Sequence, residues 1–364
     1  MTAPPALSPL ASLNSRTFET TAVLKAVVAA SRRLAELKGI AATIPNQTIL
    51  VSTLSLQEAK DSSAIENIVT THDELFKSVA FPDVARDLAA KEVRDYARAL
   101  DIGFQRVRET GLLTNAHILE VQAALERNDA GFRRLPGTSL KDGTGRVVYT
   151  PPQHPDEILA LMTDLVAFIN EDERFDADPL VKMAIVHHRF ESIHPFYDGN
   201  GRTGRIINVL YLVLRGLLDI PVLYLSRQIV RTKPEYYRLL QAVRDNESWE
   251  AWVLYMLGAV ERTAGETIHT IGDIRAALLD YQHRIRDGHK FYSQDLVNSL
   301  FQHPYTKIEL LMQDLHVSRL TATKYLDALA VDGLLRKARL GRSYYYVNVA
   351  LARILTQAEA RASA

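Results

Sequence analysis

Hydrophobic residues recur at helical spacing through the first third of the chain. Between Thr20 and Ile40 they occupy Leu24, Val27, Val28, Leu34 and Leu37, as on the buried face of an amphipathic helix. The segments Leu56 to Val79 and Asp87 to Arg108 repeat the pattern and are rich in good helix formers. The N-terminal third is therefore predicted to be mostly helical.

A β-hairpin is expected to interrupt the helices between Leu135 and Pro152. Closely spaced glycines and other turn residues there lead into the β-prone run Arg146 to Tyr149. Helical periodicity resumes at Pro155 and continues, with loops, to about Tyr281.

The last 75 or so residues show a different order. Two helical stretches lead into LLRKARLGRSYYYVNV, which is typical of two strands around a turn at Leu340, Gly341 and Arg342. Helix, turn, helix and hairpin in this order predict a winged helix.

Composition limits the classes of protein to consider. A chain of 364 residues predicts two to three domains. With 43 basic and 43 acidic residues, no overall charge draws it to nucleic acid or membrane. The absence of cysteine excludes disulfides, thiolate zinc sites and a cysteine nucleophile. The first twenty residues lack the apolar run of a signal peptide, so we expect a cytoplasmic protein.

The longest apolar stretch, Ile206 to Leu225, is interrupted by Asn208, Arg215, Asp219 and Pro221. It falls short of an uninterrupted membrane span. We therefore expect a buried helix followed by a loop, and no membrane partner.

Candidate chemistry is concentrated in ESIHPFYDGNGRTGRIINVLYL, from Glu191 to Leu212. Pro195 places His194 at the end of a helix, because the residue before a proline is disfavoured in helical conformation. Gly199, Asn200 and Gly201 permit a turn that points successive backbone N–H groups to one side, and a new helix begins just behind them. This arrangement predicts an anion-binding site at a helix N-terminus.

Two arginines extend this site. Arg202 and Arg205 are three residues apart and can face one ligand, which suggests a polyphosphate. Asp198 would repel that ligand unless a divalent metal such as Mg²⁺ bridged them. His194, with its near-neutral reference pKa, is suited to take a proton from a hydroxyl group. Together these residues suggest nucleotide-dependent group transfer.

The string HPFYDGNGRTGR is similar to the signature HPF-x-(D/E)-GNGR-x-x-R of the Fic family of adenylyltransferases across all twelve positions. SSAIEN, from Ser62 to Asn67, resembles the family's inhibitory helix motif, (S/T)-x-x-x-E-(G/N). The hairpin and the later KPEYYRLL also resemble the family, so the likeness covers roughly residues 15 to 260.

This resemblance implies transfer of AMP from ATP to a Ser, Thr or Tyr hydroxyl of a target protein. It makes His194 the catalytic base, Asp198 the ligand of Mg²⁺ and Phe196 a buried anchor of the loop. The implied nucleotide-binding residues are Gly199, Asn200, Gly201, Arg202, Thr203, Gly204, Arg205, Gly145, Arg146, Val147, Val148 and Tyr236.

The resemblance also implies a regulatory glutamate, Glu66, which would pair with Arg205 where the γ-phosphate must bind. We therefore expect an autoinhibited enzyme. In some relatives the same glutamate aligns a water that removes AMP. The hairpin Gly145 to Val148 would also offer a strand edge to the target. Where some relatives have an asparagine near the adenine this chain has Arg244, so the resemblance supplies no adenine contact there.

The fold class implied is mainly α, with a Fic-type helical core, a β-hairpin flap and a C-terminal winged-helix domain. The expected domains are an N-terminal helical region with the inhibitory helix (residues 1–112), the Fic core (113–265), a linker helix (266–290) and the winged helix (291–364). A homodimer is compatible with the family.

Two other site types are disfavoured. GNGRTG fits the dinucleotide fingerprint, with Asp219 about 20 residues on, but no strand precedes it. His188, Glu191 and His194 suggest a zinc site, but spacings of three and six spread the outer two by about 120° around a helix. His188 is more simply a buried or capping residue, and His187 a packed or solvent-facing histidine. Tyr236 and Tyr237 are as compatible with core packing as with nucleotide contact.

The C-terminal region offers a rival function. Residues 303–350 carry seven basic and four acidic side chains, a net charge of +3. In a DNA-binding protein, Ser318 to Tyr325 would be the recognition helix and Arg339 to Tyr344 the wing. A contact with protein is an equal alternative. The rivals are thus a DNA-binding regulator whose core senses a nucleotide, or a Fic enzyme that removes AMP or transfers UMP or phosphate.

Overall fold

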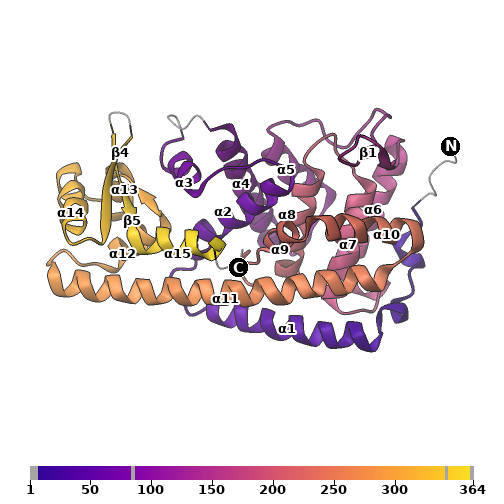
Figure 1. Cartoon of the computed structure of the whole chain (residues 1–364), viewed down its shortest axis with the longest axis horizontal. Helices are drawn as coiled ribbons and strands as arrows, with labels where there is room; N and C mark the ends of the chain where they lie inside the picture. The colour runs from indigo at the N-terminus through magenta and orange to yellow at the C-terminus, as the bar shows by residue number, and fades with distance from the viewer. Residues whose placement is uncertain (1–6, 83–86, 341–342, 361–364) are drawn as a thin grey trace. The chain divides into compact units, whose positions relative to one another are not determined.

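The computed structural model describes residues 7–82, 87–340 and 343–360, and most of them are helical (Figure 1). The prediction of a mainly helical fold is confirmed. The chain divides into two compact units, which are described separately. Unit 1 comprises residues 1–35, 61–68 and 95–264, and unit 2 comprises residues 36–60, 69–94 and 265–364. The domain boundaries expected from sequence stay predictions.

Unit 1 carries the motif region. Four of the described helices that it contains also have residues in unit 2, and the larger parts of two of them (residues 48–60 and 265–288) belong to unit 2. The main elements of unit 1 are α1 (Thr21–Ala41), α2 (Thr48–Ile65), α4 (Leu88–Thr110), α5 (Asn115–Glu126), β1 (Leu140–Lys141), β2 (Val147–Tyr149), α6 (Pro155–Asn170), α7 (Pro179–Ile193), α8 (Asn200–Leu214), α9 (Leu225–Arg231), α10 (Lys233–Asn246) and α11 (Trp249–Gly288). The expected linker helix is part of α11 rather than a separate element.

Helix α7 is the centre of unit 1, packed against α6 and α8 (Figure 1). The Asp178 carboxylate caps it by accepting from Leu180 N at 2.8 Å, and Pro179 occupies its first position. Every residue from Leu180 to Ile193 is buried, so the helix end that carries His194 is held on all sides.

The helix predicted over Leu56 to Val79 is wrong as one element. Helix α2 ends at Ile65 and α3 (His72–Ala80) begins after a short loop. Asn67 has a φ of 65° in this loop, a left-handed conformation that ends a helix and that asparagine tolerates better than most residues. Thr71 caps α3 by accepting from Glu74 N at 3.1 Å.

The predicted hairpin is present, and its turn is organised by one aspartate. Leu140 of β1 pairs with Tyr149 of β2 in an antiparallel register. Asp142 Oδ1 accepts from the backbone N–H of Thr144 at 2.9 Å and of Arg146 at 3.0 Å. We call residues 138–149 the flap.

Unit 2 contains α3 and the C-terminal elements. These are α12 (Gln294–Gln302), β3 (Tyr305–Thr306), α13 (Ile308–Leu315), α14 (Arg319–Val331), β4 (Leu335–Leu340), β5 (Ser343–Asn348) and α15 (Val349–Ala360). The sheet order is β3–β5–β4, with both neighbouring pairs antiparallel. The helix, helix and hairpin order agrees with the sequence pattern, whereas α15 was not predicted. The expected turn residues Gly341 and Arg342 lie outside the described residues.

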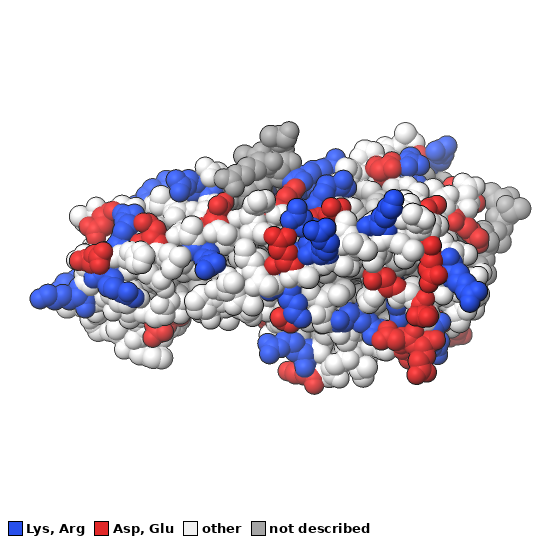
Figure 2. All heavy atoms as spheres, turned by 90° about the horizontal axis from the view of Figure 1, so that it is seen from below, with Lys and Arg blue, Asp and Glu red and all other residues white. Residues whose placement is uncertain are grey.

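Two surface properties bear on partners. Over the described residues, none of the helices combines the length and the apolar character that a membrane crossing requires. Basic and acidic side chains interleave over the face shown in Figure 2, in keeping with equal numbers of the two.

Candidate active site

A pocket of about 920 Å³ lies in unit 1 where the end of α2, the flap, the end of α7, α8 and α10 meet. Its lining includes His194 and Arg205 from the predicted motif, together with Glu66. The full lining is Glu66, Asn67, Ser139, Leu140, Lys141, Asp142, Gly143, Val148, Glu191, His194, Gly201, Arg205, Lys233, Pro234, Tyr236, Tyr237, Arg238, Gln241 and Arg244.

His194 is the residue that ends α7. It adopts a left-handed conformation with φ of 49°, and its backbone N–H donates to Phe190 O at 2.9 Å. Burial lowers the pKa of the His194 imidazole to about 4, with further lowering by the positive charges of Arg133 and Arg244. The imidazole is therefore neutral at physiological pH, which is the form that can accept a proton.

The loop after His194 is held by its own side chains. Phe196 is fully buried, as predicted for an anchor. Asn200 Oδ1 accepts from Phe196 N and Asn200 Nδ2 donates to Phe196 O, both at 2.8 Å. The Asn200 side chain thus closes the loop, and only its backbone is available for an anion. Gly199, with φ of 77°, caps the N-terminus of α8.

Glu66 and Arg205 form the central ion pair of the pocket. Glu66 Oε1 lies 2.9 Å from Arg205 Nη2, and Arg205 is 1% exposed. Ser62 accepts two further bonds from this guanidinium, through Oγ from Nε at 2.7 Å and through its backbone oxygen from Nη2 at 3.1 Å. A Cβ added to Gly201 would lie 2.4 Å from Glu66 Oε1. The carboxylate therefore rests directly on the first turn of α8.

Charge stabilises this pair in its ionised form. Burial by itself raises the pKa of Glu66, but the charge and hydrogen bond of Arg205, with Arg202 and Lys233, lower it overall. Burial by itself lowers the pKa of Arg205, but the negative charge of Glu66 outweighs this effect, so the pKa of Arg205 is raised. The carboxylate stays ionised at neutral pH, and the contact is lost only as pH falls through its lowered pKa.

A second carboxylate, which the sequence did not point to, lies at the other side of the loop. Glu126, the last residue of α5, places Oε1 2.8 Å from Arg202 Nη2. A Cβ on Gly199 would lie 2.4 Å from the same oxygen. Arg202 is thus held beside Gly199 by Glu126, and it is not among the residues that line the pocket.

Asp198 has the properties of a partial metal ligand. Its side chain is 81% exposed and lies 4.0 Å from Arg202 Nη2, and its Oδ1 accepts from Gly199 N at 2.7 Å. Within the described ranges, no cluster of three His, Cys, Asp or Glu side chains is placed to bind a metal. One exposed carboxylate beside the N-terminus of α8 fits Mg²⁺, which in proteins takes most of its remaining ligands from phosphates and water.

The flap contributes a different set of residues from the one expected. Of Gly145, Arg146, Val147 and Val148, only Val148 lines the pocket, and the segment 139–143 provides the rest. Arg146 instead pairs with Asp142 across the turn, with 3.2 Å between Nε and Oδ2. The turn around Asp142 sets which residues face inward, and periodicity does not reveal it.

The two tyrosines of α10 differ in exposure, because Tyr236 is packed in the core and Tyr237 is exposed. Tyr236 is 1% exposed and its hydroxyl is hydrogen-bonded to His187 Nε2 at 2.8 Å. Tyr237 lines the same pocket and is 46% exposed. Tyr237 is therefore the more accessible of the two rings.

Thr203 and Gly204 are buried residues of α8, and Gly204 faces α7. Thr203 is fully buried, and a Cβ on Gly204 would lie 2.9 Å from Glu191 Oε1. Gly204 thus permits close packing of α8 on α7, and neither of these two predicted nucleotide-binding residues is among the pocket residues.

Glu191 is a buried carboxyl group that lines the pocket and that sequence reasoning treated only as a weak zinc ligand. Burial raises the pKa of Glu191 to about 7, although Arg205 lowers it and Glu66 raises it further. Its Oε1 has no hydrogen-bond partner among the described residues. Glu191 is therefore a titratable group near neutral pH within the site.

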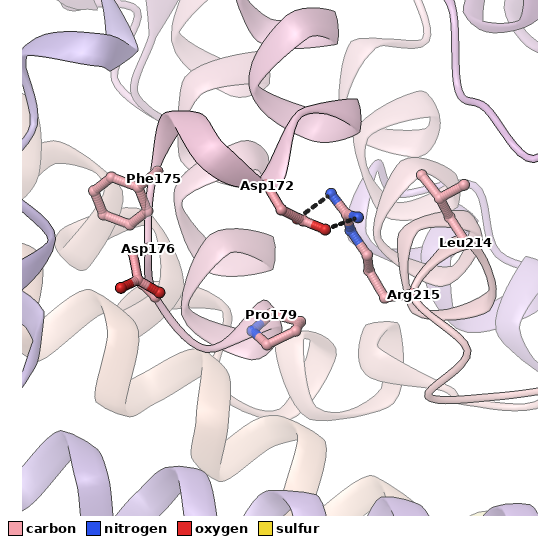
Figure 3. A pocket seen from close by; sticks show the side chains of 7 residues that line it. Asp172, Phe175, Asp176, Pro179, Leu214 and Arg215 are labelled. Atoms are coloured by element: carbon pink, nitrogen blue, oxygen red, sulfur yellow. Dashed lines mark hydrogen bonds and ion pairs between the residues drawn. The ribbon is translucent and has the colours of Figure 1, made fainter.

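A second pocket of about 330 Å³ lies around Asp172 and Phe175 (Figure 3). Arg215 and Asp172 face one another there, with Nη1 2.8 Å from Oδ2. Asp176, Pro179 and Leu214 complete the wall drawn in Figure 3. It contains none of the motif residues, so the first pocket is the candidate active site.

Comparison with known proteins agrees with this geometry. The profile of the Fic/DOC family N-terminal region matches residues 24–105, and the Fic/DOC family profile matches residues 112–212. The profile of the protein adenylyltransferase SoFic-like C-terminal domain matches residues 279–351.

Curated relatives carry adenylyltransferase names. Protein adenylyltransferase fic-1 of Caenorhabditis briggsae is 29% identical over 201 residues, which are 50% of this chain and 38% of that protein. A protein of Aquifex aeolicus named a probable protein adenylyltransferase is 31% identical over 172 residues, 46% of this chain and 50% of its own length. The chain thus matches half or less of the length of these relatives.

Solved structures share the fold. A Fic family protein from Desulfovibrio desulfuricans G20 has a TM-score of 0.57 at 22% identity, covering 91% of this chain and 96% of that one. A Fic domain containing signaling protein from Bacteroides thetaiotaomicron has a TM-score of 0.55 at 20% identity, covering 67% and 97%. With the signature motif, the pocket around it and three matching profiles in chain order, this chain belongs to the Fic/DOC family.

Proposed function

We propose that this chain transfers AMP from ATP to a hydroxyl side chain of a target protein, and that Glu66 keeps it inactive. The adenylyltransferase names of the curated relatives support the reaction type. The observation that carries the regulatory part is the contact of Glu66 with Arg205 and Gly201.

The residues present account for each part of the transfer. The neutral His194 imidazole takes the proton of the target hydroxyl as its oxygen bonds to the α-phosphorus of ATP. The bond between that phosphorus and the oxygen bridging to the β-phosphate breaks, and pyrophosphate leaves with the electron pair. Arg205 and the first backbone N–H groups of α8 stabilise the negative charge on the outer phosphates.

Mg²⁺ would be held by Asp198 together with the phosphates, and it would supply neutralisation of phosphate charge. Tyr237 offers a face for stacking of the adenine, and the Tyr236 hydroxyl is already bonded to His187. The exposed edge of the flap is suited to an extended target segment.

In this proposal Glu66 inhibits because its carboxylate occupies the place where a phosphate of ATP would bind. The first turn of α8 cannot hold the Glu66 carboxylate and a phosphate at Gly201 together, because a Cβ placed there already comes within 2.4 Å of Glu66 Oε1. Arg205 is likewise satisfied by Glu66 and Ser62. ATP bound alongside Glu66 would lack its full set of phosphate contacts.

The test is Glu66→Gly with ATP labelled at the α-phosphate in a cell lysate. Removing a charged hydrogen bond should raise labelling of a protein band by about 10- to 100-fold. Glu247→Gly is the matched control, because Glu247 is an exposed glutamate just after a helix, in a conformation that glycine accepts. Equal labelling by the parent and Glu66→Gly would contradict the inhibitory role, and His194→Ala should abolish the labelling.

The homodimer and the DNA contact stay predictions. So do the rival reactions, and mass spectrometry of the labelled protein distinguishes transfer of AMP from that of UMP or phosphate.

A further inference from the structure

Arg244, near the end of α10, binds the last turn of α7. Its Nη2 donates to Glu191 O and its Nε donates to Ser192 Oγ, both at 3.1 Å. Both acceptors lie within three residues of His194. A cation at this position also interacts favourably with the negative end of the helix.

The same guanidinium holds the flap. The Arg244 Cζ lies 4.0 Å from the ring centroid of Tyr149 in β2, a stacking contact that suits a planar cation. The Tyr149 hydroxyl donates to Ser192 O at 3.0 Å. Arg244 and Tyr149 together therefore join the flap, α10 and the end of α7.

Arg133 donates further hydrogen bonds to backbone oxygens at the end of α7. It donates from Nε to His194 O at 2.8 Å and from Nη2 to Ile193 O at 3.5 Å, while its backbone N–H donates to Pro195 O at 2.8 Å. The backbone oxygens of residues 191 to 195 thus each accept a bond from Arg244, Tyr149 or Arg133. This set of donors accounts for the left-handed backbone of His194, which a helix end alone does not enforce.

We propose that Arg244 is a positioning residue for the catalytic histidine: it ties the flap to the last turn of α7 and thereby holds the His194 imidazole in the pocket. This inference rests on the proposed function. It gives Arg244 a role other than contact with adenine. Arg244 lines the pocket, but three of its N–H groups are already bonded to Glu191 O, Ser192 Oγ and, at 3.5 Å, Gln241 Oε1.

The test compares Arg244→Gln and Arg244→Lys in the Glu66→Gly background, using the initial rate of labelling of the band found with that variant. Both substitutions remove the planar fork, so kcat should fall by about tenfold or more. The affinity for ATP, measured by calorimetry after adding His194→Ala, should change by less than about twofold. Arg106→Gln is the matched control, because Arg106 is an exposed arginine paired with Glu120 outside the pocket.

A second readout separates charge from geometry. Besides burial, the groups that act on the His194 ring are Arg133, Arg244, Glu66 and the backbone of Glu191, and the Glu191 carboxyl group lines the same pocket. An NMR titration of labelled histidine, assigned with His194→Ala, follows this ring directly. Arg244→Gln removes a positive charge and should raise the His194 pKa, whereas Arg244→Lys should leave it nearly unchanged.

The outcomes are distinct. A large loss of ATP affinity with kcat retained would make Arg244 a nucleotide contact and overturn the proposal, as would an unchanged kcat with an unchanged histidine titration. If Glu66→Gly labels no protein, the proposed function fails. The titration then still shows whether Arg244 influences the pKa of the His194 ring. If Arg244→Gln does not fold, Arg244→Lys alone carries the rate test.

Discussion

Glu66 Oε1 lies 2.9 Å from Arg205 Nη2, although the two residues are 139 positions apart in the chain. Arg205 is buried and Glu66 is partly exposed. The buried arginine is part of α8, whereas the carboxylate comes from the loop at the end of α2. Under the proposed function, a ligand would replace the partly exposed glutamate at a fixed arginine.

Ser62 should contribute to inhibition, and its neighbour should not. Ser62→Ala removes the hydroxyl that accepts from Arg205 Nε at 2.7 Å, a bond worth about 1.5 kcal/mol or more because its donor is charged. We expect labelling to rise by less than it does in Glu66→Gly, with a non-additive double variant.

Ser63→Ala is the matched control for this comparison. The Ser63 hydroxyl is buried and has no hydrogen-bond partner in the described part of the chain. Its removal should leave labelling unchanged and leave the free energy of unfolding equal or slightly higher. A larger effect from Ser63→Ala than from Ser62→Ala would contradict the assignment of the motif.

As pH is lowered, the rate of transfer should not fall near pH 6.5, where an ordinary histidine base becomes protonated. Burial and two arginines lower the His194 pKa to about 4, so the base is already neutral well below its ordinary pKa of about 6.5. In Glu66→Gly, kcat/KM for ATP, which reports the free enzyme, should show no loss with a midpoint near 6.5 as pH falls. The Glu66→Gly, Glu191→Gln double variant removes the other titration expected near 7. A clear limb at 6.5 in that variant would contradict the lowered pKa.

Glu191 should make stability depend on pH. Its pKa is raised from 4.5 to about 7 in the folded protein. A raised pKa means that the stabilising effect of the bound proton is complete below 4.5 and is lost as pH rises through 7. The ceiling for one group shifted this far is about 3 kcal/mol.

Urea unfolding of Glu191→Gln checks this sign. The variant cannot ionise, so its free energy of unfolding should exceed that of the parent at alkaline pH, and the difference should shrink toward pH 5. Glu157→Gln, on the first turn of α6, is the control for a glutamate with an ordinary position at a helix start. A parent whose relative stability did not change with pH would contradict a protonated Glu191.

Binding of DNA by the C-terminal elements should be weak. Arg319 lies 2.6 Å from Glu309, and Lys337 lies 2.6 Å from Asp327, so two of the basic side chains counted in the sequence are paired within unit 2. Gel-shift titrations between about 50 and 200 mM salt should show a shallow dependence of affinity on salt. A steep slope, reduced by Arg319→Ala, would support the DNA-binding rival instead.

Much of the fold was predictable because periodicity is a local property. The helices around Thr21–Ala41, Leu88–Thr110 and Pro155–Asn170 were expected within a few residues of their observed bounds. The break after Ile65 was missed, although Asn67, Val69 and Thr70 are weak helix formers and asparagine is a known residue at a left-handed helix end.

The site was predictable in part for a similar reason. His194, Asp198 and Arg205 lie in one contiguous motif, and Glu66 lies in a second. Residues that reach this motif from distant elements, such as Glu126 and Arg133, carry no signal in their own neighbourhoods. Their positions follow only from the packing of α5 and the flap connections around α7. The part played by Arg244 was missed for the same reason.

Gly201 lies against both Glu66 and Arg205, which has a consequence for how the protein can change. Under the proposed function, a side chain at position 201 would displace the Glu66 carboxylate and would also fill space beside Arg205 that a triphosphate needs. A substitution at this position would therefore not release activity selectively. The changes expected to raise activity while leaving α8 intact lie in the opposing segment, at Ser62 and Glu66.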